Sequence, residues 1–181
     1  QVCKALKCAA FPVVGAPAGR ALGGGCEILL HCDHVQAHAE TYMGLVEVGV
    51  GLIPGWGGCK EMLLRHTADR KRPGGPMPAI ASTFETISTA KVAKSAEEAR
   101  DLKLLRVGDG ITMNRDRLLA DAKAKALELA QAYTPPAPVE IRLPGPTARV
   151  ALDLAVQGFR ATGKATAHDE VVAGELAKVL S

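Results

Sequence analysis

The segment that decides the fold has three consecutive glycines followed by a carboxylate: Ala21-Leu22-Gly23-Gly24-Gly25-Cys26-Glu27. Glycines let the backbone approach another group closely, and an apolar helix is expected directly after them, over residues 26–32. The positive end of the helix dipole would favour an anion or a developing oxyanion. Glu27 lies in the first turn among apolar residues, where it either serves the chemistry or only stabilises the helix dipole.

A second stretch, residues 43–58, places one carboxylate, Glu47, among apolar residues and glycines. By pattern alone, a Glu on the rim of a surface loop is the simpler interpretation. Taken together, however, Glu27 and Glu47 could flank one water molecule. One carboxylate would then abstract a proton from the water while the other donates a proton to a substrate.

Short apolar runs surround these two stretches. Residues 13–14, 34–37 and 42–44 are expected to be strands, and Gly57-Gly58 is expected to lead into a helix. Strands and helices that alternate at such short intervals are typical of an α/β segment. The sequence therefore predicts the α/β class for its first part.

The sequence after residue 70 is mainly helical in pattern. Ser95, with Glu98 three residues later, predicts a capped helix over residues 96–103, and Asn114 is expected to cap a longer one. That longer helix has apolar residues at helical spacing, namely Leu118, Leu119, Ala122, Ala126, Leu127 and Ala130. Two amphipathic stretches follow, over residues 148–159 and 169–180.

These patterns divide the chain into five ranges. Residues 1–69 contain the two glycine-rich motifs, and residues 70–78 form an irregular loop with three prolines. A helical region is expected over residues 79–133. Residues 134–146 form a Pro-rich linker, and residues 147–181 form a helical extension.

Composition bounds the function. The 181 residues carry 22 Lys and Arg against 19 Asp and Glu, a net charge of +3, and 48% of them are hydrophobic. This composition indicates a globular domain with a core, and its weak charge and few aromatics argue against nucleic-acid binding. No apolar stretch is long enough to span a bilayer and no leader is evident, so we expect a cytoplasmic protein.

Neither the cysteines nor the histidines predict a metal site. The five cysteines contain no CxxC pair, which favours free thiols in a reducing compartment over disulfides or structural zinc. His31, Asp33, His34 and His38 are close in sequence. Because they follow a helix end and enter a strand, their side chains are expected to diverge. We therefore predict no metal.

The two motifs resemble the enoyl-CoA hydratase/isomerase (crotonase) superfamily, in their order and in the spacing of the two glutamates. The resemblance rests on residues 12–16 and 21–27, on Asp33, and on the run from Gly44 through Glu47 to Gly58. Residues 39–51 and 111–119 resemble, more narrowly, the crotonase part of bacterial fused 3-hydroxyacyl-CoA dehydrogenases. The implied fold is the C-terminal part of a ββα spiral followed by a helical oligomerisation region.

The resemblance implies a role for each matching residue. Glu27 would be the base that activates water, and Glu47 the acid that protonates the substrate α-carbon. The backbone N–H of Gly24 would be one of two donors to the thioester oxygen. Leu22, Gly23, Gly55 and Trp56 would contact the substrate, with Trp56 either narrowing the acyl pocket or covering a subunit contact. The implied reaction is syn addition of water to a trans-2-enoyl-CoA in fatty-acid β-oxidation.

Two alternatives stay open: a double-bond isomerase, which would need one of the two carboxylates, and a non-catalytic structural or oligomerisation module of a larger dehydrogenase. The family's second oxyanion donor and most of its coenzyme A contacts lie upstream of the motifs present here. We therefore expect this chain to be a fragment whose parent carries out catalysis.

Partners and cofactors follow from the same resemblance. The expected partners are an acyl-CoA thioester and further copies of the chain, as a trimer, or a dehydrogenase domain. No cofactor is expected in this chain, and NAD would bind only a separate dehydrogenase domain. Arg65, Arg70, Lys71 and Arg72 form a basic loop that we interpret as solvated surface, with a coenzyme A phosphate contact as the alternative.

Overall fold

The computed structural model describes residues 1–69, 71 and 73–181, and the chain forms two compact units. Unit 1 contains Gln1–Gly44 and Val92–Val139, and unit 2 contains Leu45–Lys91 and Glu140–Ser181. Each unit is thus assembled from two separate parts of the chain, whereas the five ranges expected from the sequence are consecutive. Arg70 and Arg72 of the basic loop lie outside the described residues.

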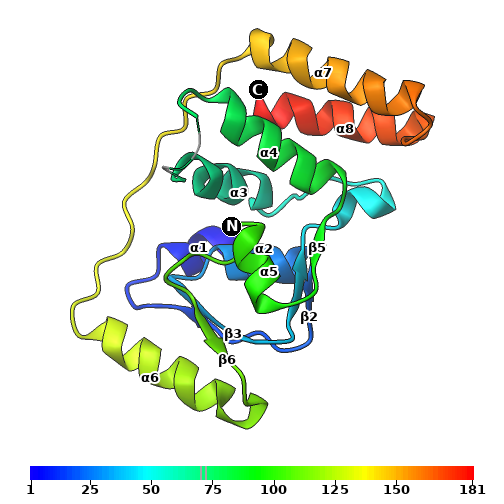
Figure 1. The fold of residues 1–181 in the computed structure, drawn as a ribbon. Coiled ribbons are helices and arrows are strands. Elements are labelled where there is room, and N and C mark those ends of the chain that lie inside the picture. Colours follow the sequence, from blue (N-terminus) through cyan, green and yellow to red (C-terminus); the bar gives the residue numbers. More distant parts are fainter. Residues whose placement is uncertain (70, 72) are drawn as a thin grey trace. The chain divides into compact units, whose positions relative to one another are not determined.

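Two small three-stranded sheets form the centre of unit 1 (Figure 1). The first has the order β1-β3-β6 and is all parallel, with β1 at Val14–Gly15, β3 at His34–His38 and β6 at Gly110–Thr112. The second has the order β2-β4-β5, with β2 at Arg20–Leu22, β4 at Tyr42–Gly44 and β5 at Val92–Ala93. In it β2 and β4 are parallel and β5 is antiparallel. The α/β class expected from the sequence is confirmed.

The strands around the motifs agree closely with the sequence pattern, and the other strands do not. The strands expected at residues 13–14, 34–37 and 42–44 are β1, β3 and β4, shifted or extended by a single residue at most. In β3, Val35 and Ala37 are completely buried, as the short apolar run requires. The strands β2, β5 and β6 were not predicted, and they form by pairing with the neighbouring strands β4 and β3.

Four helices and one 3₁₀ turn complete unit 1: α1 (Val2–Lys7), α2 (Gly24–Leu30), α5 (Ala96–Asp101), η2 (Arg115–Arg117) and α6 (Leu118–Ala130). Helix α2 contacts β2, α5 contacts β4, and α6 contacts β1 and β3. The cap expected at Ser95 is confirmed, because its side chain accepts a hydrogen bond from the backbone N–H of Glu98 at 3.1 Å. Helix α5 nevertheless ends two residues before the expected boundary.

Helix α6 buries only part of its apolar residues, and its expected cap is corrected. Its apolar stripe is only partly buried, since Leu118 and Ala122 are buried while Leu119 is 76% exposed and Leu127 is 61% exposed. The helix packs on the first sheet along one narrow face, which accounts for the difference. Asn114 caps the preceding turn η2 rather than α6 itself, because its Oδ1 accepts from the backbone N–H of Asp116 at 2.9 Å.

Unit 2 consists of helices and one 3₁₀ turn over its described residues: η1 (Glu47–Val50), α3 (Gly58–Thr67), α4 (Met77–Ser88), α7 (Pro146–Ala161) and α8 (Ala167–Leu180). Helices α7 and α8 form a hairpin and lie side by side, and α4 packs against both α3 and α8 (Figure 1). The fully buried side chains of this unit include Met62, Ile80, Ile87, Leu176 and Leu180.

The ends of two helices in unit 2 differ from the expected ranges. Helix α4 begins at Met77, inside the segment expected to be loop, and Pro78 fits there because a first helical turn needs no donor at that position. Helix α8 begins at Ala167, before the expected residue 169. Its start is a capping box in which the Thr166 hydroxyl accepts from the backbone of Asp169 and the Asp169 carboxylate accepts from that of Thr166.

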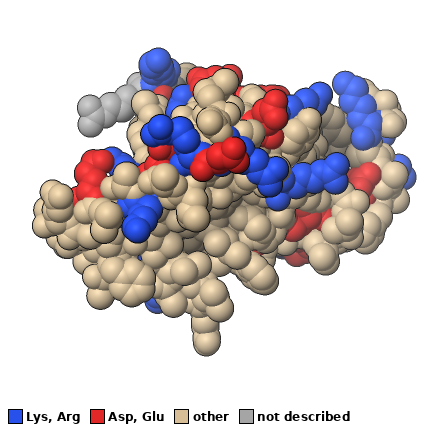
Figure 2. Space-filling view, turned by 90° about the horizontal axis from the view of Figure 1, so that it is seen from below, with Lys and Arg blue, Asp and Glu red and all other residues tan. Residues whose placement is uncertain are grey.

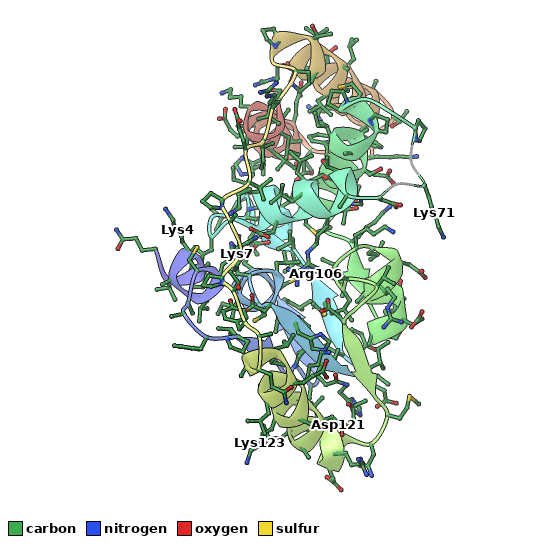
Figure 3. All side chains as sticks on the ribbon, turned by 90° about the vertical axis from the view of Figure 1, so that its left-hand side faces the viewer. Lys4, Lys7, Lys71, Arg106, Asp121 and Lys123 are labelled. Atoms are coloured by element: carbon green, nitrogen blue, oxygen red, sulfur yellow. The ribbon has the colours of Figure 1, made fainter. Side chains whose placement is uncertain are left out.

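Both signs of charge are interspersed on the face shown in Figure 2, in keeping with the small net charge of the sequence. None of the helices among the described residues has both the length and the apolar composition that crossing a membrane requires. Lys4 and Lys7 extend from α1, and Lys123 extends from α6 (Figure 3).

Candidate functional site

The turn that joins β2 to α2 requires the glycine at position 23. Gly23 is the N-cap of α2 and has φ 56° and ψ −128°, a conformation that a residue with a Cβ rarely adopts. Its backbone N–H donates to the carbonyl oxygen of Gly44, at the end of β4, at 2.9 Å. Gly24 is the first residue of α2, so helix geometry leaves its N–H without an intrahelical acceptor.

Glu27 is deeply buried at the beginning of α2. Its side chain is 2% exposed, and its backbone N–H donates to the carbonyl oxygen of Gly23 at 3.0 Å. Helix α1 places the thiol of Cys3 near this carboxylate: burial raises the pKa of Cys3, and the negative charge of Glu27 raises it further. Cys3 therefore belongs to the surroundings of Glu27, although 24 positions separate the two in the printed sequence.

His31 lies on the same face of α2 as Glu27, because residues four apart are neighbours on a helix. Its Nδ1 is 2.7 Å from the backbone carbonyl oxygen of Glu27. A carbonyl oxygen only accepts, so this ring nitrogen carries the proton and donates it. The ring is 3% exposed. His31 therefore fixes the backbone of Glu27 and does not bind its carboxylate.

The other end of α2 is fixed by groups from distant parts of unit 1. The guanidinium of Arg106, labelled in Figure 3, donates from Nη1 to the carbonyl oxygens of Cys32 and Asp33 at 3.0 and 2.9 Å. The Asp33 carboxylate accepts from the backbone N–H of Val13 at 2.7 Å and from the hydroxyl of Tyr133 at 3.1 Å. Burial raises the pKa of Tyr133, and its hydrogen bond to Asp33 adds to the rise.

The histidines and aspartates after α2 are held by protein groups. Nδ1 of His34 lies 3.8 Å from Oδ1 of Asp109, and that oxygen also accepts from the backbone N–H of Val35 at 2.9 Å. Among residues 1–69, 71 and 73–181, no group of three or more His, Cys, Asp or Glu side chains is arranged to hold a metal ion.

Glu47 is the first residue of η1 in unit 2. Both of its carboxylate oxygens are shielded from solvent. Turn η1 ends at Gly51, which has φ 77°, and a Cβ built there would come within 2.9 Å of Nε2 of His168. The start of α8 therefore lies directly against the turn that carries Glu47.

The predicted site residues are divided between the two units. Leu22, Gly23, Gly24 and Glu27 lie together in unit 1, at the end of β2 and the start of α2. Glu47 lies in unit 2, and so do Gly55 and Trp56, in the loop that leads from η1 to α3. The Trp56 side chain is 61% exposed. Lys71 of the basic loop, labelled in Figure 3, is exposed, and its backbone N–H donates to Oδ1 of Asp69 at 3.1 Å.

Three residues related to these motifs were not predicted from the sequence: Cys3, whose pKa the charge of Glu27 raises, Arg106 at the end of α2, and His168 against Gly51. Each comes from a part of the chain far from its neighbour in the sequence. A lone Cys, Arg or His carries no pattern of its own, so the sequence contained no local signal for these contacts.

Comparisons with known proteins agree with the motifs. The family profile described as "Enoyl-CoA hydratase/isomerase" matches residues 2–71. A "Probable 3-hydroxyacyl-CoA dehydrogenase" of Bacillus subtilis (strain 168) is 45% identical over 177 residues, which cover 97% of this chain and 22% of that protein. A "Putative fatty acid oxidation complex trifunctional enzyme" of Rickettsia felis is 48% identical over 67 residues, 37% of this chain and 9% of that protein.

The fold is also similar to that of solved enoyl-CoA hydratase structures. The crystal structure of enoyl-CoA hydratase from Bacillus anthracis superimposes with a TM-score of 0.56 at 23% identity, covering 97% of this chain and 55% of that one. The chain therefore spans about half of that hydratase and a smaller share of the two relatives named above. Together these findings place the chain in the enoyl-CoA hydratase/isomerase (crotonase) superfamily.

Proposed function

We propose that the chain carries the two acid–base carboxylates of an enoyl-CoA hydratase, as the crotonase part of a 3-hydroxyacyl-CoA dehydrogenase-like protein. The observation that carries the proposal is the burial of Glu27, 2% exposed, directly behind the glycine turn that begins α2. A buried carboxylate beside a glycine turn and a helix N-terminus that can bind an anion is a candidate for acid–base chemistry. In this proposal residues 1–69 are the second half of the spiral core, and residues 79–133 and 147–181 are its helical parts.

In the proposed reaction Glu27 is the base. It removes a proton from water, and the resulting hydroxide adds to C3 of a trans-2-enoyl thioester. The bond from His31 to the Glu27 carbonyl and the bonds from Arg106 to the end of α2 support this role, because they fix the helix that positions the carboxylate.

Glu47 is the proposed acid. It donates a proton to C2 on the same face, which completes syn addition of water and gives the 3-hydroxyacyl thioester. The role is supported by the shielding of both carboxylate oxygens from solvent, since a shielded group exchanges its proton with a bound substrate rather than with bulk water. After the reaction Glu27 is protonated and Glu47 is ionised. Proton exchange with solvent restores the starting protonation states.

The negative charge that develops on the thioester oxygen must be stabilised by a hydrogen-bond donor. The proposed donor is the backbone N–H of Gly24, at the first position of α2. Leu22 and Gly23 would lie along the thioester, and Gly55 and Trp56 along the acyl or coenzyme A part. Every step of this chemistry uses protein groups, water and the substrate, so no cofactor is required in this chain.

Product analysis separates this proposal from its alternatives. The complete protein is incubated with a trans-2-enoyl-CoA and, separately, with a 3-enoyl-CoA. We expect formation of 3-hydroxyacyl-CoA from the first substrate. Conversion of the 3-enoyl thioester without hydration would make the protein an isomerase. Normal assembly of the protein with neither reaction would leave a structural module.

We also propose that the protein is a homo-oligomer in a reducing compartment such as the cytoplasm. The exposure of Leu119 and Leu127 on α6 supports a further contact for that helix. The absence of a disulfide among the five cysteines is consistent with a reducing compartment. Light scattering coupled to size-exclusion chromatography measures the mass: a trimer is the expected result, and a monomer at all concentrations would contradict it.

A further inference from the structure

The turn that begins with Glu47 ends on a glycine that lies against a histidine of α8. Gly51 has φ 77°, in the left-handed region, and its N–H donates to the carbonyl oxygen of Val48 at 3.0 Å. The next N–H, of Leu52, donates to the carbonyl oxygen of Glu47 at 3.0 Å. A Cβ built on Gly51 would come within 2.9 Å of Nε2 and 3.4 Å of Cδ2 of His168. The imidazole therefore packs against the residue on which the turn closes.

The start of α8 fixes the backbone that carries this imidazole. His168 is the second residue of the helix and lies between the two members of the capping box, Thr166 and Asp169. The backbone N–H of Thr166 donates to the Asp169 carboxylate at 2.8 Å, and the backbone N–H of Asp169 donates to the Thr166 hydroxyl at 3.2 Å. Farther along the helix, Val172 and Leu176 are buried. The position of His168 is thus defined although its side chain is exposed.

The turn needs a restraint on the side that faces α8. Glycine adopts left-handed and right-handed conformations about equally well, so Gly51 alone does not hold the turn in one shape. Val48 and Gly49 line a cavity of about 400 Å³, whose wall also includes Asp169 and Ala173 of α8. Because this cavity leaves the middle of the turn loosely packed towards α8, the contact at the end of the turn matters more.

We propose that His168 is a positioning residue for Glu47 and acts through Gly51. Packing of the imidazole keeps Gly51 in its left-handed conformation, and the two hydrogen bonds of the turn then hold the backbone of Glu47 in place. This role rests on the proposed function of Glu47 as the acid, because a small displacement of an acid–base group is enough to slow the reaction. In this way the helical extension, residues 147–181, contributes to the chemistry of the site.

Hydrogen exchange measures the turn directly. It is followed in the complete protein by mass spectrometry of peptides that cover residues 47–52. His168→Ala should raise exchange there, because the variant removes the ring that lies against Gly51, and the fold should be kept because the side chain is exposed. Val171→Ala, at another exposed position of α8, is the control and should leave exchange of this segment unchanged. Unchanged exchange over residues 47–52 in His168→Ala would overturn the proposal.

Steady-state kinetics with a trans-2-enoyl-CoA separate positioning from a general structural effect. His168→Ala should lower kcat by roughly 3- to 30-fold and leave KM unchanged. His168→Gln keeps a flat group of similar reach and should recover most of the loss. In the Glu47→Gln background, His168→Ala should lower the residual rate no further, because the group that His168 positions is already gone. An equal fold loss in the two backgrounds would overturn the proposal.

The failure of this role and the failure of the proposed function give different results. A wild-type protein that does not hydrate the substrate would overturn the proposed function and this role with it. A wild-type protein that hydrates the substrate, with a His168→Ala variant equal to it in exchange and in kcat, would overturn the role of His168 alone.

Discussion

Nδ1 of His31 donates a hydrogen bond of 2.7 Å to the backbone carbonyl oxygen of Glu27, one helical turn earlier. The bond links the side chain at the C-terminal end of α2 to the backbone of the residue that carries the buried carboxylate. His31 therefore acts on Glu27 through the position of the backbone and is a positioning residue for it.

Replacement of His31 by Ala should lower the free energy of unfolding by roughly 1–3 kcal/mol, because it removes a buried ring and its hydrogen bond to the Glu27 carbonyl. Urea denaturation measures the change. His38→Ala, at a half-buried histidine of β3, is the control and should cost less. Equal losses in the two variants would show that the bond to Glu27 contributes nothing.

The capping box of α8 predicts a dependence of stability on pH. Hydrogen bonds from the backbone and side chain of Thr166 lower the pKa of Asp169 from its ordinary value of 3.8. A lowered pKa in the folded state stabilises the fold above pH 4, and this stabilisation is lost as the pH falls through the folded pKa. The advantage of the wild-type chain over Asp169→Asn should therefore be present at pH 6 and shrink towards pH 3.

Urea midpoints at a series of pH values test this dependence. Asp101→Asn, at an exposed aspartate of α5, is the control and should follow the wild-type chain. Thr166→Ala removes the hydroxyl of the same box and should cost about 1 kcal/mol at neutral pH. A constant difference between the wild-type chain and Asp169→Asn from pH 6 to pH 3 would contradict the assignment.

Tyr133 should ionise above pH 10. Burial raises the pKa of its phenol, and the hydrogen bond to the Asp33 carboxylate raises it further. Because the pKa of Tyr133 is raised in the folded state, the protonated phenol stabilises the fold. This stabilisation is complete below pH 10 and is lost as the pH rises through the folded pKa. The sequence has only two tyrosines, so ultraviolet titration of Tyr42→Phe isolates Tyr133. Ionisation of Tyr133 at or below pH 10 would show that the bond to Asp33 does not form.

The end of α4 contains a strained alanine. Ala90 has φ 48°, in a turn where its N–H donates to the Ile87 carbonyl at 3.0 Å and the Lys91 N–H donates to the Thr86 carbonyl at 3.1 Å. Helices usually place glycine at this position. Ala90→Gly should therefore raise the free energy of unfolding by up to about 1 kcal/mol. Ala81→Gly, at an exposed position inside the same helix, is the control and should lower it.

The sequence predicted the first motif well because its determinants are local. Gly23 adopts a backbone conformation that suits glycine, and the apolar residues after it have helical spacing, so α2 could be located to within two residues. The cap at Ser95 is local in the same way, since its partner Glu98 lies three residues on.

Features that depend on contacts between distant residues could not be predicted. The strands β5 and β6 exist because β4 and β3 lie beside them, and their own two or three residues carry no pattern. The bonds from Arg106 to the end of α2 and the contact of His168 with Gly51 likewise join residues more than 70 positions apart. The exposure of Leu119 depends on which face of α6 meets the sheet.

The proposed hydration requires Glu27 and Glu47 to act together as base and acid. Their joint action is measured by kcat/KM for hydration of crotonyl-CoA by the complete protein carrying Glu27→Gln, Glu47→Gln or both changes. Each single change should lower the value by roughly 10²–10⁴. The double change should lower kcat/KM by a much smaller factor than the product of the two single reductions, because both groups act in one step. Glu40→Gln and Glu140→Gln, at exposed glutamates, should leave it unchanged. A single variant at Glu27 or Glu47 that keeps the wild-type kcat/KM would show that the replaced carboxylate is not one of the two acid–base groups.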